Sequence, residues 1–160
     1  MHEIKIIKGN MDDLEDLHQL WIQLIEYHHD IGNIGGFIYK SDRYDDLRKH
    51  LEKEIQHNKF CVMVAKLDGQ SIGFAKANIL SYPTFFEDNV FCMIGQIFVQ
   101  EEFRGKGIGS RLINTIEEWA KEKDINQVRL GLNYKNKRSF SFYEKLDYKP
   151  TSITLKKRLK

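Results

Sequence analysis

A glycine-rich loop between an apolar run and a helical pattern is the feature that most constrains this chain. Residues 91–99 are nearly continuously apolar, as a central strand buried on both faces should be. The loop that follows is Arg104-Gly105-Lys106-Gly107-Ile108-Gly109. It opens a predicted helix whose apolar face is Leu112, Ile113, Ile116, Trp119 and Ala120. Because glycine has no Cβ, the backbone of such a loop can approach a ligand closely and point its N–H groups at an anion.

The loop predicts a site for a phosphate or pyrophosphate, and Arg104 and Lys106 add positive charge beside the helix N-terminus. A glycine turn that serves only packing fits the same pattern. Two other phosphate motifs do not fit. A Walker loop needs a lysine followed by serine or threonine, whereas Gly109 is followed by a serine and an arginine. A dinucleotide fold needs G-x-G-x-x-G and an acid about 20 positions later, whereas this loop is G-x-G-x-G and residues 127–133 contain no acid.

Length and composition favour one folded domain over residues 1–160. The formal net charge of +2 argues against nucleic acid as the main partner. Only a basic tail favours a role bound to RNA or to the ribosome, and it consists of Lys156, Lys157, Arg158 and Lys160. No segment approaches the ~20 apolar residues of a membrane span, and the first residues lack a signal core. We therefore expect a cytoplasmic protein with no membrane partner.

Neither the cysteines nor the histidines have the spacing of metal ligands. Cys61 and Cys92 lie in apolar runs, which predicts buried thiols rather than a disulfide or a zinc site. The histidines form no H-x-x-x-H or H-E-x-x-H pattern, so no metal is expected. They are His2, His18, His28, His29, His50 and His57.

Hydrophobic periodicity predicts the order strand, helix, helix, three strands, helix, strand, helix, strand. This order indicates an α/β or α+β fold with both hairpin and crossover connections. The second helix should start near Ser41 or Asp42, and Asp68-Gly69 should turn the hairpin. Apart from the strand and helix around the glycine loop, the expected ranges are 4–7, 14–25, 44–55, 60–67, 71–80, 128–132, 136–146 and 153–155.

Two stretches in the second half resemble a known family. Residues 97–112 look like the acetyl-CoA signature of GNAT N-acetyltransferases, whose core is Arg/Gln-x-x-Gly-x-Gly/Ala. Residues 136–148 are similar to the family's Asn-x-x-Ala-x-x-Phe-Tyr-x-x-x-Gly-Phe, with Ser139 in place of Ala and Asp147 in place of Gly. The specific match covers residues 91–150. The signature core is filled by Arg104, Gly107 and Gly109.

The resemblance implies a mixed, mostly antiparallel central sheet that splays open after the strand ending at Val99 and is flanked by about four helices. Acetyl-CoA would lie in the split, with its pantetheine along that strand and its pyrophosphate on the N–H groups of the loop. The implied acetyl-CoA-binding residues are Ile97, Phe98, Val99, Arg104, Gly105, Lys106, Gly107, Ile108, Gly109, Ser110, Asn136 and Tyr143. One of the basic side chains Lys135, Lys137 and Arg138 would meet the 3′-phosphate.

Acetyl transfer to an amine also needs an acid and a base. An amine with a pKa of about 10.4 is almost entirely protonated at pH 7, and the leaving thiolate gains from a proton donor. Tyr143 matches the family's tyrosine acid, although a core aromatic beside Phe140 is the alternative interpretation. The positions where the family often carries a basic carboxylate look like Gly95, Gln96 and Gly131. The base is therefore unassigned, with a water held by Gln96 as one possibility and with weaker candidates in His28, Glu26 and Glu87.

The acceptor amine is expected between two loops, residues 32–39 and 81–89. Their aromatic residues predict a rimmed pocket for a small molecule, although the same residues suit a homodimer contact. The loops contain Phe37, Tyr39, Tyr82, Phe85 and Phe86, and Tyr27 precedes the first loop. Two other functions remain open from the sequence. One is a non-catalytic acyl-CoA-binding or sensor domain, and the other is acetylation of a protein amine.

Overall fold

The chain folds into helices and strands that alternate much as the periodicity predicts. The computed structural model describes residues 3–32, 40–157 and 159. Short 3-10 turns lie at Met11–Asp13, Ser41–Arg43 and Glu101–Phe103. The main elements are β1 (Ile4–Lys8), α1 (Leu14–Asp30), α2 (Tyr44–Gln56), β2 (Phe60–Leu67), β3 (Gln70–Ser81), β4 (Val90–Val99), α3 (Ile108–Glu122), β5 (Val128–Leu130) and α4 (Lys137–Glu144). Within the described residues, no helix is long and apolar enough to cross a membrane.

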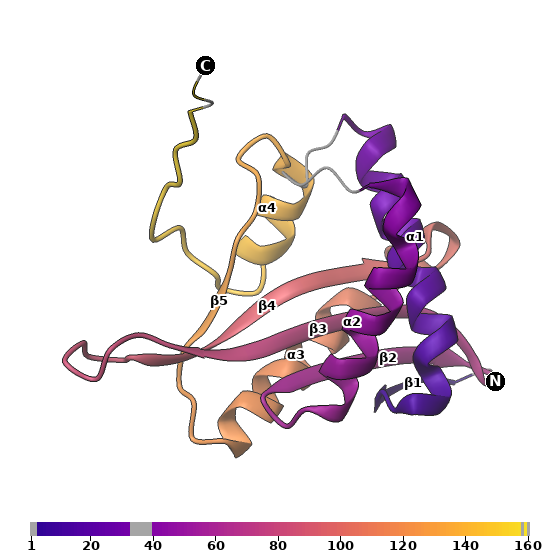
Figure 1. Ribbon diagram of the computed structural model, residues 1–160, viewed down its shortest axis with the longest axis horizontal. Coiled ribbons are helices and arrows are strands. Elements are labelled where there is room, and N and C mark those ends of the chain that lie inside the picture. The colour runs from indigo at the N-terminus through magenta and orange to yellow at the C-terminus, as the bar shows by residue number, and fades with distance from the viewer. Residues whose placement is uncertain (1–2, 33–39, 158, 160) are drawn as a thin grey trace.

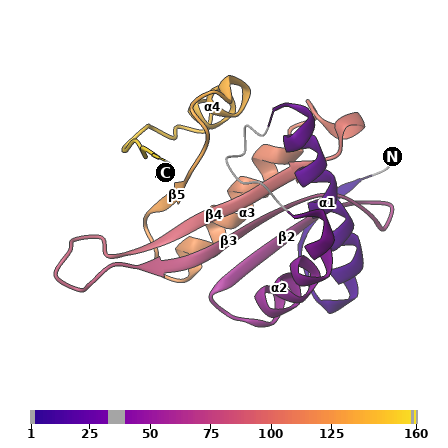
Figure 2. The same ribbon diagram turned by 45° about the horizontal axis from the view of Figure 1, so that its top comes forward.

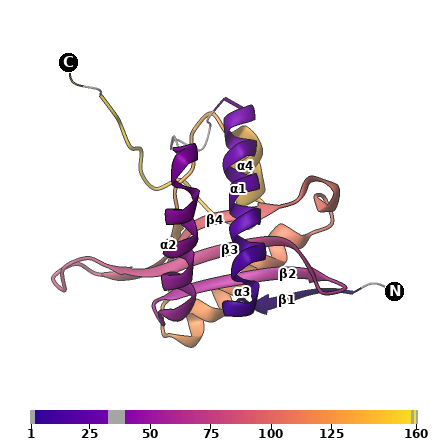
Figure 3. The ribbon, with the colours of Figure 1, turned by 45° about the vertical axis from the view of Figure 1, so that its right-hand side comes forward.

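The strands form one mixed sheet in the order β1-β2-β3-β4-β5. Strands β1 to β4 pair with one another in antiparallel fashion, and β5 runs parallel to β4. Helices α1 and α2 lie side by side on one face of the sheet, and α3 covers the other (Figures 1 and 3). A parallel pair needs a crossover connection, which α3 provides between β4 and β5. Helix α4 follows β5 and stands at that edge of the sheet (Figure 2).

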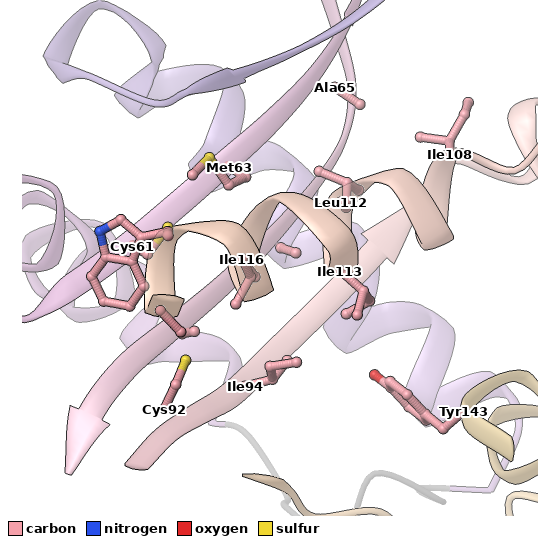
Figure 4. Close-up of a cluster of buried hydrophobic side chains, with 14 of the residues drawn as sticks. Cys61, Met63, Ala65, Cys92, Ile94, Ile108, Leu112, Ile113, Ile116 and Tyr143 are labelled. Carbon is pink, nitrogen blue, oxygen red and sulfur yellow. The ribbon is translucent and has the colours of Figure 1, made fainter. Parts of the chain in front are cut away.

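Each face of the sheet carries its own hydrophobic core. Apolar residues recur in α3 at helical spacing, so that Leu112, Ile113 and Ile116 all turn toward strand residues such as Met63 and Ile94 (Figure 4). Burying one such side chain contributes about 1.5–3 kcal/mol, which fixes α3 and the loop before it against the sheet. On the opposite face, α1 and α2 pack through the second cluster of Leu14, Leu17, Leu20, Trp21, Leu24, Ile25, Leu51, Val62, Val64, Phe74 and Phe98.

The sheet splits between β4 and β5, as the resemblance implies. The two strands pair only from Cys92↔Val128 to Ile94↔Leu130. Beyond Ile94, β4 continues to Val99 with β3 on one side and no described strand on the other. The register on the β3 side also shifts here, because Lys76 pairs with Gln96 and Ala77 with Ile94, which makes Gly95 an extra residue. Such bulges are common beside active sites because they turn the strand locally.

Two expectations about the elements are wrong. Residues 153–155 form no strand, and Ile153 and Leu155 are 88% and 90% exposed. The tail runs away from the sheet (Figure 1), so it has no strand partner for its backbone groups. β4 is not buried on both faces along its length, because it lies second from the edge and Val90 and Gly95 are exposed. Helix α2 begins at Tyr44, since a 3-10 turn occupies Ser41–Arg43.

Candidate active site

A cavity of about 370 Å³ opens where the sheet splits. Its wall combines the end of β4, the glycine loop, the start of α3, α4 and the last turn of α1. The sequence-predicted residues on this wall are Ile97, Phe98, Val99, Arg104, Gly105, Gly107, Ile108, Gly109, Ser110, Asn136 and Tyr143. Thus two stretches about 25 residues apart in the sequence meet around one space. Lys106 is the exception: its side chain is absent from the wall, and its Nζ lies 5.3 Å from the centroid of the Phe103 ring.

The glycine loop has the backbone conformation that only glycine adopts without strain. Gly105 and Gly107 have φ angles of 78° and 75°, in the left-handed region. A Cβ built on either residue meets nothing within 4 Å, so the space beside them is open. Gly107 is also the N-cap of α3, whose first N–H groups have no partner inside the helix. This arrangement suits an anion such as pyrophosphate.

Gly109 serves a different purpose from the other two loop glycines. A Cβ on Gly109 would lie 3.3 Å from Cζ of Phe142. The residue therefore allows α4 to pack closely against α3. A substitution at Gly109 disturbs this helix contact as well as the cavity, so it is a poor test of ligand binding.

Arg104 is held by the protein rather than pointing freely into the cavity. Its Nε donates a hydrogen bond of 2.8 Å to the carbonyl oxygen of Val99. Its guanidinium carbon lies 4.5 Å from the centroid of the Tyr27 ring and 5.6 Å from that of Phe98. These contacts join the end of β4 to α1, and Arg104 forms part of the cavity wall from this position.

Asn136 and Tyr143 come from the two ends of α4. Oδ1 of Asn136 accepts a hydrogen bond of 3.1 Å from the Ser139 backbone, which caps the helix. The ring of Tyr143 packs edge-on against Phe142 and Tyr148. Figure 4 shows its hydroxyl end turned toward Ile94 and Ile113. Burial raises the pKa of Tyr143 to about 12, so its hydroxyl remains protonated at neutral pH.

The candidate bases occupy different places. His28 lines the cavity from α1, and burial lowers the pKa of its imidazole, which favours the neutral form that accepts a proton. Glu26 and Glu87 line neither this cavity nor the second one described next. Gln96 lies one residue before the predicted acetyl-CoA strand segment and belongs to the second cavity.

A second cavity, of about 730 Å³, lies on the face of the sheet covered by α1 and α2. It adjoins the first one along β4: Gly95 and Gln96 line the second, and the three residues after them line the first. At its base, Lys76 of β3 forms a buried ion pair with Glu54 of α2. The rest of its described wall includes Trp21, Lys40, Arg43, Tyr44, Asp46, Leu47, His50, Phe60, Ala77 and Asn78.

The sequence interpretation missed Glu54 and Lys76, although both carry a signal. Glu54 lies three residues after Leu51 on the apolar face of its helix, where a carboxylate is out of place. Lys76 is the only charged residue in the otherwise apolar and polar run 71–80, and it lies two residues after Phe74 on the same strand face. A charge in such a position needs a buried partner, but the identity of that partner is not visible in the sequence.

The expected aromatic rim is wrong for the loop between β3 and β4. Tyr82, Phe85 and Phe86 are exposed and line neither cavity. They pack on one another at the end of the hairpin, which projects away from α1 and α2 (Figure 1). Tyr27 does line the first cavity. Phe37 and Tyr39, also expected in the rim, lie outside the described residues.

The two cysteines lie in the core, as their apolar runs predict. Cys61 and Cys92 are both buried and free. Nε2 of His18 lies 2.9 Å from the Tyr44 carbonyl oxygen, which links α1 to α2. In the part of the chain that the structure describes, no group of three or more histidines, cysteines and carboxylates is arranged to hold a metal ion.

The split sheet with a glycine loop at a helix N-terminus defines an acetyltransferase fold. A match to the Acetyltransferase (GNAT) family spans residues 19–148, so the chain belongs to this family. It is an acetyl-CoA-dependent N-acetyltransferase.

Three known proteins illustrate the relationship. The chain is 28% identical over 144 residues to an uncharacterized N-acetyltransferase of Archaeoglobus fulgidus. The aligned residues cover 90% of this chain and 92% of that protein. A stretch of 66 residues is 38% identical to thialysine N-epsilon-acetyltransferase of Bos taurus and covers 41% of this chain and 38% of that enzyme. The aminoglycoside N-acetyltransferase AAC(6')-Iy in complex with CoA has the same fold, with a TM-score of 0.82 at 22% identity, covering 99% of this chain and 96% of that one.

Proposed function

We propose that this enzyme transfers the acetyl group of acetyl-CoA directly to the primary amine of a small molecule while both substrates are bound. One observation carries the proposal: the two cavities meet on consecutive residues of β4, at the point where the sheet splits. A donor in the first cavity and an acceptor in the second would be held side by side. Such positioning replaces a bimolecular encounter and can supply much of the rate enhancement.

The first cavity fits acetyl-CoA, which supplies an acetyl group activated as a thioester. The open N–H groups around Gly105 and Gly107 would hold its pyrophosphate, and the N-terminus of α3 favours this negative charge. The unpaired edge of β4 from Ile97 to Val99 would bind the pantetheine through backbone hydrogen bonds. A backbone N–H near Val99 would stabilise the carbonyl oxygen as it gains negative charge.

Two side chains would handle the protons. The acceptor ammonium must lose a proton before its nitrogen forms a bond to the carbonyl carbon, and Gln96 would hold the water that takes it. When the carbon–sulfur bond breaks, Tyr143 would give its proton to the thiolate. The raised pKa of Tyr143 keeps its hydroxyl protonated at neutral pH, so the proton is present when the thiolate forms.

The size of the second cavity, about 730 Å³, favours a small molecule over a protein amine. The relatives agree with this class, since their names specify thialysine and aminoglycosides, both of which are small molecules with amines. Acetylation of a protein amine would instead need a groove that receives an extended peptide.

A panel of amines incubated with acetyl-CoA tests the proposal, with release of the CoA thiol as the signal. We expect steady turnover with at least one small amine and saturation in both substrates. A parallel calorimetric titration with CoA measures binding without chemistry. Tight CoA binding with no turnover on any small amine, combined with turnover on a peptide, would refute the proposed acceptor class.

A further inference from the structure

The charges in the second cavity are largely neutralised from within the protein. Both carboxylate oxygens of Glu54 have partners, because Oε2 accepts from Lys76 and Oε1 lies 3.1 Å from Nε2 of His50. Nearer the opening, Asp46 is paired with Arg43. Each carboxylate in the described wall is therefore paired with a cationic or basic side chain. Residues 33–39, which precede the wall residue Lys40, contain no acidic residue in the sequence.

This balance is unfavourable for an acceptor with several positive charges. A polycation gains binding energy from carboxylates that are not already neutralised. To bind here, it would have to displace Lys76 from Glu54, and both side chains are more than nine-tenths buried. Removing one member of a buried pair leaves the other charge without compensation, which is costly.

The cavity wall does offer hydrogen-bond donors with spare capacity. The Lys76 ammonium has three N–H donors, of which the structure directs one to Glu54. Its Nζ lies 3.7 Å from the centroid of the Trp21 ring. Nε1 of Trp21 can only donate, and it is buried with no partner among the described residues. Burial also lowers the pKa of Lys76, so an additional anion beside it would offset part of its desolvation cost.

An unused acceptor lies across from these donors. Oε1 of Gln96 is buried and has no partner among the described residues. Gln96 and Lys76 are opposite one another in the register of β3 and β4, and opposed residues of antiparallel strands place their side chains on the same face. Gln96 immediately precedes the β4 segment that lines the first cavity. The wall thus offers one acceptor, on the β4 residue that precedes the donor cavity, and N–H donors on β3 and α1.

We propose that the second cavity selects an acceptor that carries a carboxylate as well as its reacting amine, so that Lys76 and Trp21 bind the carboxylate while Gln96 directs the amine toward the first cavity. The substrate class is an amino acid with a side-chain amine. Polycationic amines without a carboxylate are poor acceptors. This inference rests on the proposed function, because it assigns the second cavity to the acceptor.

The test uses two pairs of acceptors that differ only in a carboxylate: L-lysine with cadaverine, and L-ornithine with putrescine. A charge-assisted hydrogen bond predicts a kcat/KM that is about 10- to 100-fold higher for the amino acid of at least one pair. Lys76→Met/Glu54→Gln removes the ion pair without leaving a lone buried charge, and it should reduce this ratio to about one. Lys66→Met/Asp13→Asn removes a different lysine–carboxylate pair, remote from both cavities, and should retain the wild-type ratio.

Calorimetry on the CoA-bound protein provides a readout that does not depend on turnover. L-lysine should bind more tightly than cadaverine to the wild type and to the Lys66→Met/Asp13→Asn protein, but not to Lys76→Met/Glu54→Gln. A wild-type enzyme that prefers cadaverine and putrescine overturns the inference, as does an unchanged preference in the Lys76→Met/Glu54→Gln enzyme. If small amines are acetylated with no preference for those that carry a carboxylate, this inference is wrong and the proposed function still holds. If no small amine is acetylated, the proposed function fails, and the calorimetric comparison still decides whether the cavity binds a carboxylate.

Discussion

Tyr143 lies at the boundary between a hydrophobic core and the first cavity, and this position determines its chemistry. The ring belongs to the cluster packed under α3, while the same residue forms part of the cavity wall. Loss of hydration disfavours the charged phenolate and raises the pKa from 10.0 to about 12. A tyrosine in this environment keeps its proton throughout the physiological pH range, so its hydroxyl can act as a hydrogen-bond or proton donor but not as a base.

We predict that Tyr143→Phe lowers kcat by about 10²–10⁴-fold, the usual contribution of a general acid, with little change in the KM for acetyl-CoA. Stability should change little because the ring and its packing remain. In the wild type, kcat should show no loss from tyrosine ionisation up to pH 10, since the pKa is about 12. Tyr148→Phe is the matched control: its hydroxyl bonds Glu117 at 2.8 Å and lines neither cavity. A Tyr143→Phe enzyme with wild-type kcat would show that Tyr143 contributes packing and not a proton.

Both cysteines should be unreactive in the folded protein. Burial raises the pKa of Cys61 to about 12 and that of Cys92 to about 11, and neither side chain is exposed. Because the thiolate is the nucleophile, we predict negligible reaction with a thiol-directed chromogenic disulfide at pH 8. Two equivalents should react once urea unfolds the chain. Rapid labelling of the native protein would show that one core opens readily.

At the scale of elements, the loop before α3 depends on left-handed glycines. We predict that Gly107→Leu weakens CoA binding by at least about 10-fold, because a side chain at φ 75° is strained by about 1–2 kcal/mol and fills the open space beside the helix N-terminus. Far-UV circular dichroism should show an intact fold. Gly131→Ala is the control, since a Cβ there meets nothing within 4 Å and no positive φ opposes it. If calorimetry gives the same CoA affinity for both variants, the loop is not part of the CoA-binding site.

The elements around this loop were predictable from the sequence because each is specified by local pattern. The glycine spacing, the period of α3 and the Asp68-Gly69 turn all depend on neighbours a few residues away. The predicted strand at residues 153–155 is wrong because a strand does not depend on local pattern alone. Ile153 and Leu155 alternate as in a strand, but a strand also needs a partner, and alternation says nothing about one.

The second cavity could not be predicted from the sequence because its wall residues come together only in the folded chain. Trp21, Glu54, Lys76 and Gln96 come from four elements, and helix α2 brings Glu54 to Lys76 only when it packs on the sheet. The first cavity was easier, since two motifs line most of its wall. Even there, packing decided the details: Gly109 accommodates Phe142, and Lys106 lies over Phe103 instead of in the cavity.

For the molecule as a whole, we predict that the free energy of unfolding falls as the pH rises from 9 to 12. Cys61, Cys92 and Tyr143 release their protons at about 12, 11 and 12 in the folded state, compared with 9.0 for the thiols and 10.0 for the phenol in an exposed setting. Burial, followed by hydrogen bonding to Glu117, raises the pKa of Tyr148 as well. The folded state therefore binds more protons than the unfolded state in this range. The contribution of these groups to the free energy of unfolding is fully present below pH 9 and is lost as the pH rises through their folded-state pKa values.

Lys76 acts in the opposite direction, because its folded pKa is lowered, but it is one group against these four. Urea midpoints should decrease steadily between pH 9 and pH 11 while far-UV circular dichroism in the absence of urea stays constant. Tyr143→Phe should flatten the part of this decline between pH 10 and pH 12, since only its ionisation is removed, and Tyr134→Phe, which changes an exposed tyrosine, should not. Midpoints that remain level up to pH 11 would mean that the thiols and tyrosines of the α3 core ionise as easily when folded as when unfolded, which is incompatible with their burial.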